Sequence, residues 1–357
     1  MENFDYDLQS VQEARNLARL GKIAADKIAD YTDEQIDKIL QNMVRVAEEN
    51  AVMLAKMAVE ETGFGKVEDK TFKNHLASTI VYNYIKDMKC HGIIHEDPVK
   101  KMMEVADPVG LICGIVPSTN PTSTVIYKSM IALKAHNAIV FSPHPSALQC
   151  TLKAATLMCE AAVAAGAPEN VISCVSKPSM GATDELMKCK ETMLIIATGG
   201  PGMVKAAYSA GKPALGVGAG NSPSYIERTA DVHQSVKDIL ASKTFDYGTV
   251  CASEQSVICE ECNRDAVIAE FKKQGGYFMT AEETAKVCSL LFKNGGHSMS
   301  AKFVGRSPQV IATAAGINIP EGTRVLIGEQ QGVGDGYPLS YEKLTSVLAF
   351  YTVRDWH

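Results

Sequence analysis

Short runs of apolar residues alternate with longer amphipathic stretches through the middle of the chain. The four runs share an apolar character on both faces and lie at residues 111–116, 138–141, 171–175 and 193–197. Apolar positions spaced for a helix follow them, at about residues 122–134, 147–165 and 181–188. Strands that are buried on both sides and separated by helices indicate βαβ units and a parallel sheet.

The first ninety or so residues have a helical pattern. Ser10 with Glu13 and Thr32 with Gln35 both fit the capping box, in which a hydroxyl and a carboxylate or amide satisfy free N–H groups at a helix start. The second box opens a long amphipathic pattern, and a further helix is expected at residues 72–85. These helices are expected to pack against the parallel sheet.

The last third of the chain predicts a second α/β region. Its expected strands lie at residues 255–259, 324–327 and 347–351. Its expected helices lie near residues 282–293 and 309–315, and one more, at 231–243, precedes it. The change of pattern places a domain boundary near residue 245.

The charge and composition argue against a nucleic-acid-binding, membrane-spanning or secreted protein. Of the 357 residues, 46% are hydrophobic, and the formal net charge is −6. An acidic chain without a basic stripe is not expected to bind nucleic acid. No apolar run is long enough to span a membrane, and the N-terminus has no secretory signal pattern. The ten cysteines are therefore expected to be reduced thiols of a cytoplasmic protein.

The segment K-T-F-D-Y-G-T-V-C-A-S-E-Q-S-V, residues 243–257, places Cys251 between a glycine-containing turn and a predicted strand. A cysteine thiolate at such a turn can act as a nucleophile. Taken alone, Cys251 is one cysteine among ten, and an unreactive thiol is the simpler interpretation.

Three loops follow predicted strands, at residues 116–121, 141–145 and 197–202. Ligands of parallel sheets bind at the carboxyl ends of strands. The third loop, A-T-G-G-P-G, opens a helix whose N–H groups could hold a pyrophosphate. Because G-x-G-x-x-G is absent, each loop by itself could equally be an ordinary strand-to-helix turn.

Together these motifs resemble the aldehyde dehydrogenase superfamily. The resemblance rests on V-P-S-T-N-P-T-S-T, F-S-P-H-P, A-T-G-G-P-G-M-V-K-A-A, G-V-G-A-G-N-S-P and V-C-A-S-E-Q-S-V, which occur in the family's order. It is closest to the CoA-acylating branch, which includes the aldehyde dehydrogenase half of bifunctional aldehyde–alcohol dehydrogenases and microcompartment enzymes. It implies an α/β fold in which a Rossmann-like, parallel-sheet cofactor domain precedes an α/β catalytic domain.

The resemblance implies catalytic roles for Cys251 and Asn120. Cys251 matches the nucleophile, whose thiolate adds to an aldehyde to give a thiohemiacetal and, after hydride loss to a nicotinamide, a thioacyl-enzyme. Asn120 matches the asparagine whose side-chain N–H stabilises the developing alkoxide. Without the family match, Asn120 would be interpreted as a turn residue before Pro121.

The resemblance also implies the cofactor site. The residues that it assigns to a nicotinamide cofactor are Thr119, Ser142, Pro143, His144, Gly199, Gly200, Gly202 and Glu342. Without the match, Glu342 would be a solvated glutamate before a strand. His144 stands where hydrolytic members usually carry lysine, and NAD is favoured over NADP.

The resemblance predicts attack by a thiol in place of water. Hydrolytic members carry E-L-G-G-K-x-P, whose glutamate activates water, whereas this chain has V-G-A-G-N-S-P with Val217 at the glutamate position. Loss of a positioned base costs about 10²- to 10⁴-fold in rate. Coenzyme A is therefore the expected co-substrate, and a short-chain aldehyde or acyl-CoA the substrate. Two alternatives stay open: a hydrolytic aldehyde dehydrogenase with another base, and an inactive truncated domain for cofactor binding or assembly.

Residues 1–244 are thus expected to form the N-terminal helices and NAD-binding domain, and residues 245–357 the catalytic domain. The family's catalytic domain continues past the position of His357, so a truncated catalytic domain is expected. A homo-oligomer, dimer or tetramer, is implied for the full-length form, and a bacterial microcompartment is the alternative location to the cytoplasm.

No metal site is expected. Cys259 and Cys262 have C-x-x-C spacing but lack a second ligand pair. His91 and His95 lack the glutamate of H-E-x-x-H. His297 could lie near the acyl or CoA pocket, although a surface turn is the simpler interpretation.

Overall fold

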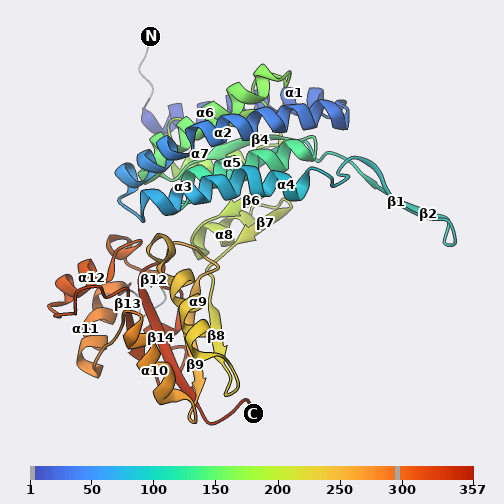
Figure 1. Ribbon diagram of the computed structural model, residues 1–357. Coiled ribbons are helices and arrows are strands. Elements are labelled where there is room, and N and C mark those ends of the chain that lie inside the picture. Colours follow the sequence, from blue (N-terminus) through green and yellow to red (C-terminus); the bar gives the residue numbers. More distant parts are fainter. Residues whose placement is uncertain (1–4, 294–297) are drawn as a thin grey trace. The chain divides into compact units, whose positions relative to one another are not determined.

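The computed structural model describes residues 5–293 and 298–357, which leaves His297 outside the described residues. The chain forms two compact units (Figure 1). The first contains the residues up to Thr62 together with Val67–Gly218, and the second contains Gly63–Lys66 and Ala219–His357.

A five-stranded parallel sheet forms the centre of the first unit. Its strands are β3 (Leu111–Ile115), β4 (Ala138–Ser142), β5 (Ile172–Cys174), β6 (Thr192–Thr198) and β7 (Ala214–Val217). They lie in the order β5-β4-β3-β6-β7. The chain therefore adds β4 and β5 on one side of β3 and then crosses back to add β6 and β7 on the other side, so the strand order reverses between the neighbours β3 and β6. Every residue of β3 and β4 is buried, as their apolar runs predict.

Helices cover both faces of this sheet. On one face α5 (Pro121–Lys134) and α6 (Leu148–Ala164) pack together, with α2 (Asp33–Thr62) packed across them. On the other face lie α1 (Tyr6–Ile28) and α7 (Met180–Lys188), and α8 (Pro201–Tyr208) packs beside β6 and β7. The predicted α/β fold with a parallel sheet is confirmed.

Only one of the two predicted capping boxes is present. The Thr32 N–H donates to the Gln35 side chain at 2.8 Å, and the Gln35 N–H donates to the Thr32 hydroxyl at 3.3 Å. The prediction for Ser10 was wrong, because α1 already begins at Tyr6. Inside the helix the buried Ser10 hydroxyl instead bonds to the loop before α7, at the Ser179 hydroxyl (2.7 Å).

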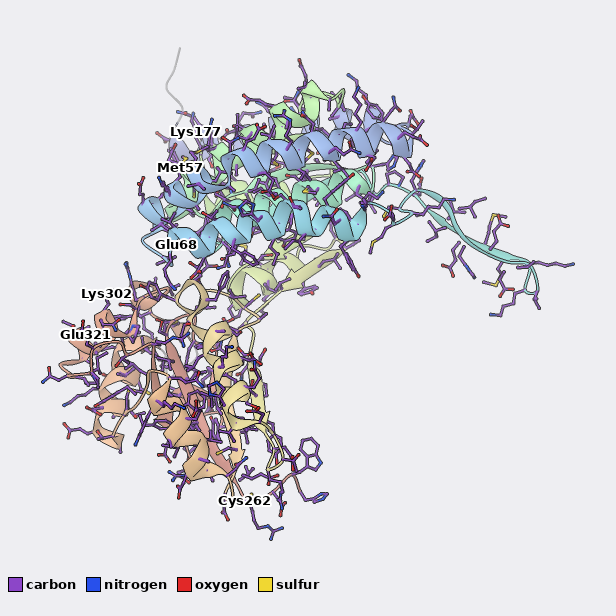
Figure 2. All side chains as sticks on the ribbon, in the orientation of Figure 1. Met57, Glu68, Lys177, Cys262, Lys302 and Glu321 are labelled. Carbon is purple, nitrogen blue, oxygen red and sulfur yellow. The ribbon has the colours of Figure 1, made fainter. Side chains whose placement is uncertain are left out.

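The expected third helix is longer than predicted and is followed by a hairpin that was not expected. It consists of α3 (Val67–His75), a π-helical turn (Leu76–Ile80) and α4 (Val81–Ile85). The antiparallel strands β1 (Gly92–Asp97) and β2 (Met102–Ala106) then extend away from the unit, and their side chains project to both sides (Figure 2).

The second unit is built on another five-stranded parallel sheet. Its strands are β8 (Ser222–Ile226), β9 (Glu254–Glu260), β10 (Gly276–Phe278), β13 (Val325–Glu329) and β14 (Val347–Val353). They lie in the order β10-β13-β14-β9-β8. A separate short ladder joins β11 (Phe292–Lys293) to β12 (Ser298–Met299).

Two hydrophobic cores lie on the two faces of this sheet. Helices α9 (Val232–Thr244) and α10 (Arg264–Lys273) belong to one core, which takes Leu348 and Phe350 from β14. Helices α11 (Ala281–Leu291) and α12 (Pro308–Ala315) belong to the other, which takes Val347 and Ala349. Alternate residues of β14 thus enter opposite cores, as the period of a strand requires.

The boundary between the units differs from the one predicted at residue 245. The structure divides the chain between Gly218 and Ala219, which places α9 in the second unit. The reason is that β8 pairs with β9 across the expected boundary and α9 connects these two strands.

Within residues 5–293 and 298–357, no helix combines the length and the apolar character that crossing a membrane requires.

Candidate active site

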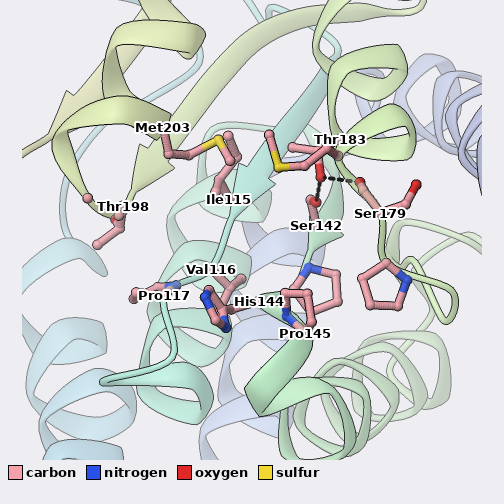
Figure 3. A pocket seen from close by; sticks show the side chains of 15 residues that line it. Ile115, Val116, Pro117, Ser142, His144, Pro145, Ser179, Thr183, Thr198 and Met203 are labelled. Carbon is pink, nitrogen blue, oxygen red and sulfur yellow. Dashed lines mark hydrogen bonds between the residues drawn. The ribbon is translucent and has the colours of Figure 1, made fainter. Parts of the chain in front are cut away.

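A cavity of about 420 Å³ opens in the first unit where the strand order reverses. Its lining comes from the segments that follow β3, β4 and β6, including Pro117, His144 and Gly199. Figure 3 shows Ser142, Thr183 and Ser179 joined by hydrogen bonds on one side of the cavity. A reversal of strand order beside carboxyl strand ends is where open α/β sheets bind ligands.

Five of the residues predicted to bind a cofactor line this cavity. They are Ser142, Pro143, His144, Gly199 and Gly200. Their side chains and those of the other lining residues carry no carboxylate, ammonium or guanidinium group. The cavity therefore offers an apolar slot with a few hydroxyl groups, which suits a flat, uncharged ring better than a charged group.

His144 is held as a hydrogen-bond acceptor. Its Nδ1 accepts from the Ser146 N–H at 3.2 Å, so His144 caps the short helical turn before α6. The same nitrogen lies 2.8 Å from the Ser146 hydroxyl. Partial burial lowers the pKa of His144. Both effects favour the neutral ring, because protonation of Nδ1 would remove the acceptor.

The A-T-G-G-P-G loop, residues 197–202, leads into the start of a helix, as the sequence predicted. Gly200 is the N-cap of α8, Pro201 is its first residue, and Gly202 lies in the first turn. The N–H groups of a first helical turn have no partner within the helix and favour anions. Gly202 is not among the residues that line the cavity, but it belongs to the same turn.

Thr119 and Asn120 lie beside the start of α5, at the end of the loop that follows β3. Asn120 is the N-cap of that helix, yet its side chain makes no capping hydrogen bond. Two buried lysines of α3 hold the pair: Lys70 donates to the Thr119 carbonyl oxygen at 2.7 Å, and Lys73 donates to Asn120 Oδ1 at 2.6 Å. The Asn120 side chain therefore bonds to Lys73 and does not cap the helix, which is the usual role of an asparagine at this place.

Cys251 lies in the second unit, after an unusual turn. Asp246 and Tyr247 both have φ of 49°, and Gly248 follows with φ of 76°. Successive left-handed residues other than glycine are strained and persist only where contacts enforce them. Here the buried Asp246 carboxylate accepts the Lys66 N–H at 2.7 Å and the Thr249 hydroxyl.

Exposure distinguishes Cys251 from most of the other cysteines. Burial raises the pKa of Cys113 to about 12 and the pKa of Cys259 and Cys288 to about 11. Cys251 and Cys262 are the exposed cysteines. Cys262 lies beyond the far end of β9 (Figure 2), where its thiol contacts Glu260, so it is separated from Cys251 by the length of that strand.

Glu342 is joined to the Cys251 segment through one glycine. Its Oε1 accepts the Gly220 N–H at 2.8 Å, and burial raises the pKa of the Glu342 carboxyl group. The Gly220 α-carbon in turn faces the Cys251 carbonyl oxygen, because a Cβ built there would lie 1.9 Å from that oxygen. The predicted nucleophile Cys251 and the predicted cofactor residue Glu342 are therefore held together through Gly220.

Among the described residues, one group of side chains has the composition of a metal site. The ligand atoms of Asp33, His91 and His136 lie within 4.8 Å of one another. The two imidazole rings are stacked, however, with centroids 4.3 Å apart and 23° between their planes. The nitrogen lone pairs of an imidazole lie in the plane of its ring, so two stacked rings do not point their lone pairs at one common ion. The geometry therefore fits stacking of His91 on His136, with Asp33 in contact with His136, better than binding of one metal ion by all three residues.

Sequence comparison assigns the chain to a family. A profile described as "Aldehyde dehydrogenase family" matches residues 5–280. The chain belongs to the aldehyde dehydrogenase family. Within it, the chain belongs to the acylating branch that its motifs predicted.

Relatives of this aldehyde dehydrogenase chain include single and bifunctional enzymes. The bifunctional aldehyde-alcohol dehydrogenase AdhE of Escherichia coli K12 is 48% identical over 347 residues, which cover 97% of this chain and 39% of that protein. The chain thus spans about two fifths of the length of that relative.

Solved structures agree in fold. An acetylating aldehyde dehydrogenase from Geobacillus thermoglucosidasius is 55% identical, with a TM-score of 0.95, over 99% of this chain and 78% of that one. A propionaldehyde dehydrogenase from Rhodopseudomonas palustris, solved with bound CoA and an acylated cysteine, is 27% identical, with a TM-score of 0.82. That match covers 96% of this chain and 77% of the other.

The sequence did not reveal three buried lysines that lie near the candidate site residues of the first unit. Besides Lys70 and Lys73, Lys128 of α5 donates to the Ile115 and Ile196 carbonyl oxygens, at 2.8 and 3.0 Å. The only available signal was a lysine inside an otherwise apolar helical pattern, and Lys128 is such a residue.

Proposed function

We propose that this chain is the aldehyde dehydrogenase portion of a nicotinamide-dependent, CoA-acylating enzyme. It would interconvert a short-chain aldehyde, CoA and NAD⁺ with acyl-CoA, NADH and a proton. The observation that carries this proposal is Cys251, an exposed cysteine held after a strained turn in a chain of the acylating branch.

The reaction divides into addition, oxidation and acyl transfer. The Cys251 thiolate forms a C–S bond to the aldehyde carbon, and the carbonyl oxygen becomes an alkoxide that the Asn120 amide N–H stabilises. A bound nicotinamide cofactor would accept the hydride, which leaves a thioester on Cys251. The CoA thiolate then attacks the thioester carbon, and Cys251 departs as a thiolate.

Val217 favours a thiol as the final nucleophile. It is the last residue of β7 and is 45% exposed, so a side chain at this position projects from the strand end. An apolar side chain cannot remove a proton from water. A thiol needs less assistance because it is far more acidic than water.

The preferred cofactor is proposed to be NAD rather than NADP. Three features of the first unit support this preference: the neutral His144 ring, the uncharged cavity lining and the Glu61 carboxylate. Glu61 accepts the Gln149 and Cys150 N–H groups, both at 2.8 Å, so the α6 helix start is already occupied by an anion. A lower kcat/KM with NADP than with NAD is expected, and equal values would contradict the preference.

We also propose a cytoplasmic homo-oligomer. Ten free cysteines support a reducing compartment. Exposed apolar residues of the hairpin, Met102 and Met103 at 61% and Val105 at 59%, support contact with another copy. Light scattering should give a mass of at least two times the chain mass of 38.4 kDa, and a mass of one chain would contradict the oligomer.

The nucleophile is tested with Cys251→Ala, with Cys262→Ala as the matched exposed control. The first variant should lose acyl transfer and retain cofactor binding, measured by quenching of protein fluorescence. The control should keep both. Acyl transfer retained by Cys251→Ala would reject the assignment of the nucleophile.

A further inference from the structure

Two buried lysines of α3 reach the loop that carries Asn120. Lys70 and Lys73 lie three positions apart, so they share one face of the helix. Their relative exposures are 2% and 9%. Burying an ammonium group is costly unless it is hydrogen-bonded, and both groups donate to the end of this loop.

The contact of Lys73 sets the orientation of the Asn120 amide. An ammonium group has three donors and no acceptor, so it can bond only to the amide oxygen. The 2.6 Å contact is indeed made to Oδ1, which directs Nδ2 away from Lys73. A helix cap would also use Oδ1, but the Asn120 side chain makes no capping bond to α5.

The same contact strengthens the amide as a donor. Hydrogen bonds from charged donors are shorter and stronger than neutral ones. A cation at Oδ1 withdraws electron density from the amide, and the N–H groups become better donors to an anion. An oxyanion hole requires a donor that is fixed and polarised before charge develops on the substrate.

We propose that Lys73 is a positioning residue that fixes and polarises the Asn120 amide, with Lys70 securing the adjacent Thr119 carbonyl. This inference rests on the proposed function, in which Asn120 stabilises the alkoxide formed on addition of Cys251. In this proposal Lys73 acts through Asn120.

The matched control is Lys134. It is also a buried lysine of the first unit, 8% exposed, and its Nζ also donates to one carbonyl oxygen, that of Lys86, at 2.8 Å. Lys134 is the last residue of α5, at the opposite end of that helix from Asn120. Lys134→Met removes the same type of side chain and hydrogen bond without touching the loop.

The test is a double-mutant cycle with Lys73→Met, Asn120→Ala and the double variant. Lys73→Met should lower kcat about 10- to 100-fold with unchanged cofactor affinity, since removing a whole oxyanion donor costs about 10²- to 10³-fold. The double variant should be no slower than Asn120→Ala alone. Additive losses, or a normal kcat in Lys73→Met, would overturn the proposal.

A second readout does not depend on turnover. With ¹⁵N-labelled asparagine, the side-chain amide resonance of Asn120 is identified by its absence in Asn120→Ala. Lys73→Met should shift this resonance and Lys134→Met should not. An unshifted resonance would overturn the contact, whereas an inactive unmodified chain with a shifted resonance would reject the proposed function and leave the contact established.

Discussion

The Gly220 α-carbon packs against the carbonyl oxygen of Cys251, and no side chain fits between them. A Cβ on Gly220 would lie 1.9 Å from that oxygen, which is backbone and cannot rotate away as a side chain does. The Gly220 N–H also donates to Glu342 at 2.8 Å. One glycine therefore sets the position of the nucleophile segment relative to the glutamate.

Gly220→Ala is expected to displace the Cys251 segment. Turnover should fall by up to about 100-fold, the loss produced by misplacing a reacting group by about 1 Å. The rate of Cys251 alkylation by iodoacetamide, measured by mass spectrometry, should change as well, because the surroundings of the thiol change.

Gly218→Ala serves as the control for the alkylation rate. A Cβ at Gly218 meets nothing within 4 Å, so this variant should alkylate at the unmodified rate. Equal alkylation and equal turnover in Gly220→Ala and the unmodified chain would show that the close approach does not constrain the nucleophile.

Val217→Glu is expected to create hydrolytic activity. The exposed position at the end of β7 can accept a carboxylate, which would supply the base that water needs. NADH formation from aldehyde without CoA should rise about 10-fold or more over the unmodified chain.

Val217→Gln separates basicity from size. Its amide is nearly isosteric with the carboxylate but cannot take a proton, so it should leave CoA-independent turnover low. Equal CoA-independent rates in the Glu and Gln variants would show that residue 217 does not decide between water and CoA.

Lys128 is expected to make stability depend on pH. Burial lowers the pKa of Lys128 to about 7, against about 10.4 for an unfolded lysine. Between about pH 7 and 10 the unfolded chain binds the proton and the folded chain does not, so the free energy of unfolding should rise with pH.

The comparison with Lys128→Met isolates this contribution, because the variant has no titrating group there. The difference in free energy of unfolding, unmodified minus variant, should increase from pH 7 to pH 9 by up to about 1.4 kcal/mol per pH unit. Urea unfolding at the two pH values measures it, and a pH-independent difference would contradict the lowered pKa.

The buried strands could be predicted because their apolar runs are continuous. Strands β3 and β4 are buried at every residue, and the sequence indicates both. Edge strands β7 and β8 were missed, since they are only partly buried and contain Gly216 and Pro223, which weaken a strand pattern. Hairpin β1–β2 was missed because its apolar residues are exposed and no core pattern marks them.

Sequence motifs identify the candidate site residues, but they do not identify the residues that hold them in place. Cys251 and Asn120 stand in recognisable motifs, and their roles remain predictions. The Lys73–Asn120 hydrogen bond joins residues 47 positions apart, and no local sequence pattern predicts such a contact. The same holds for Gly220 and Cys251, whose close approach depends on how β8 pairs with β9.

The most direct test of the central claim is NADH formation from a short-chain aldehyde and NAD⁺, followed with and without CoA. Continuous NADH formation that requires CoA, with matching formation of acyl-CoA, is the predicted result. An equal continuous rate without CoA, with release of the free acid, would contradict the account.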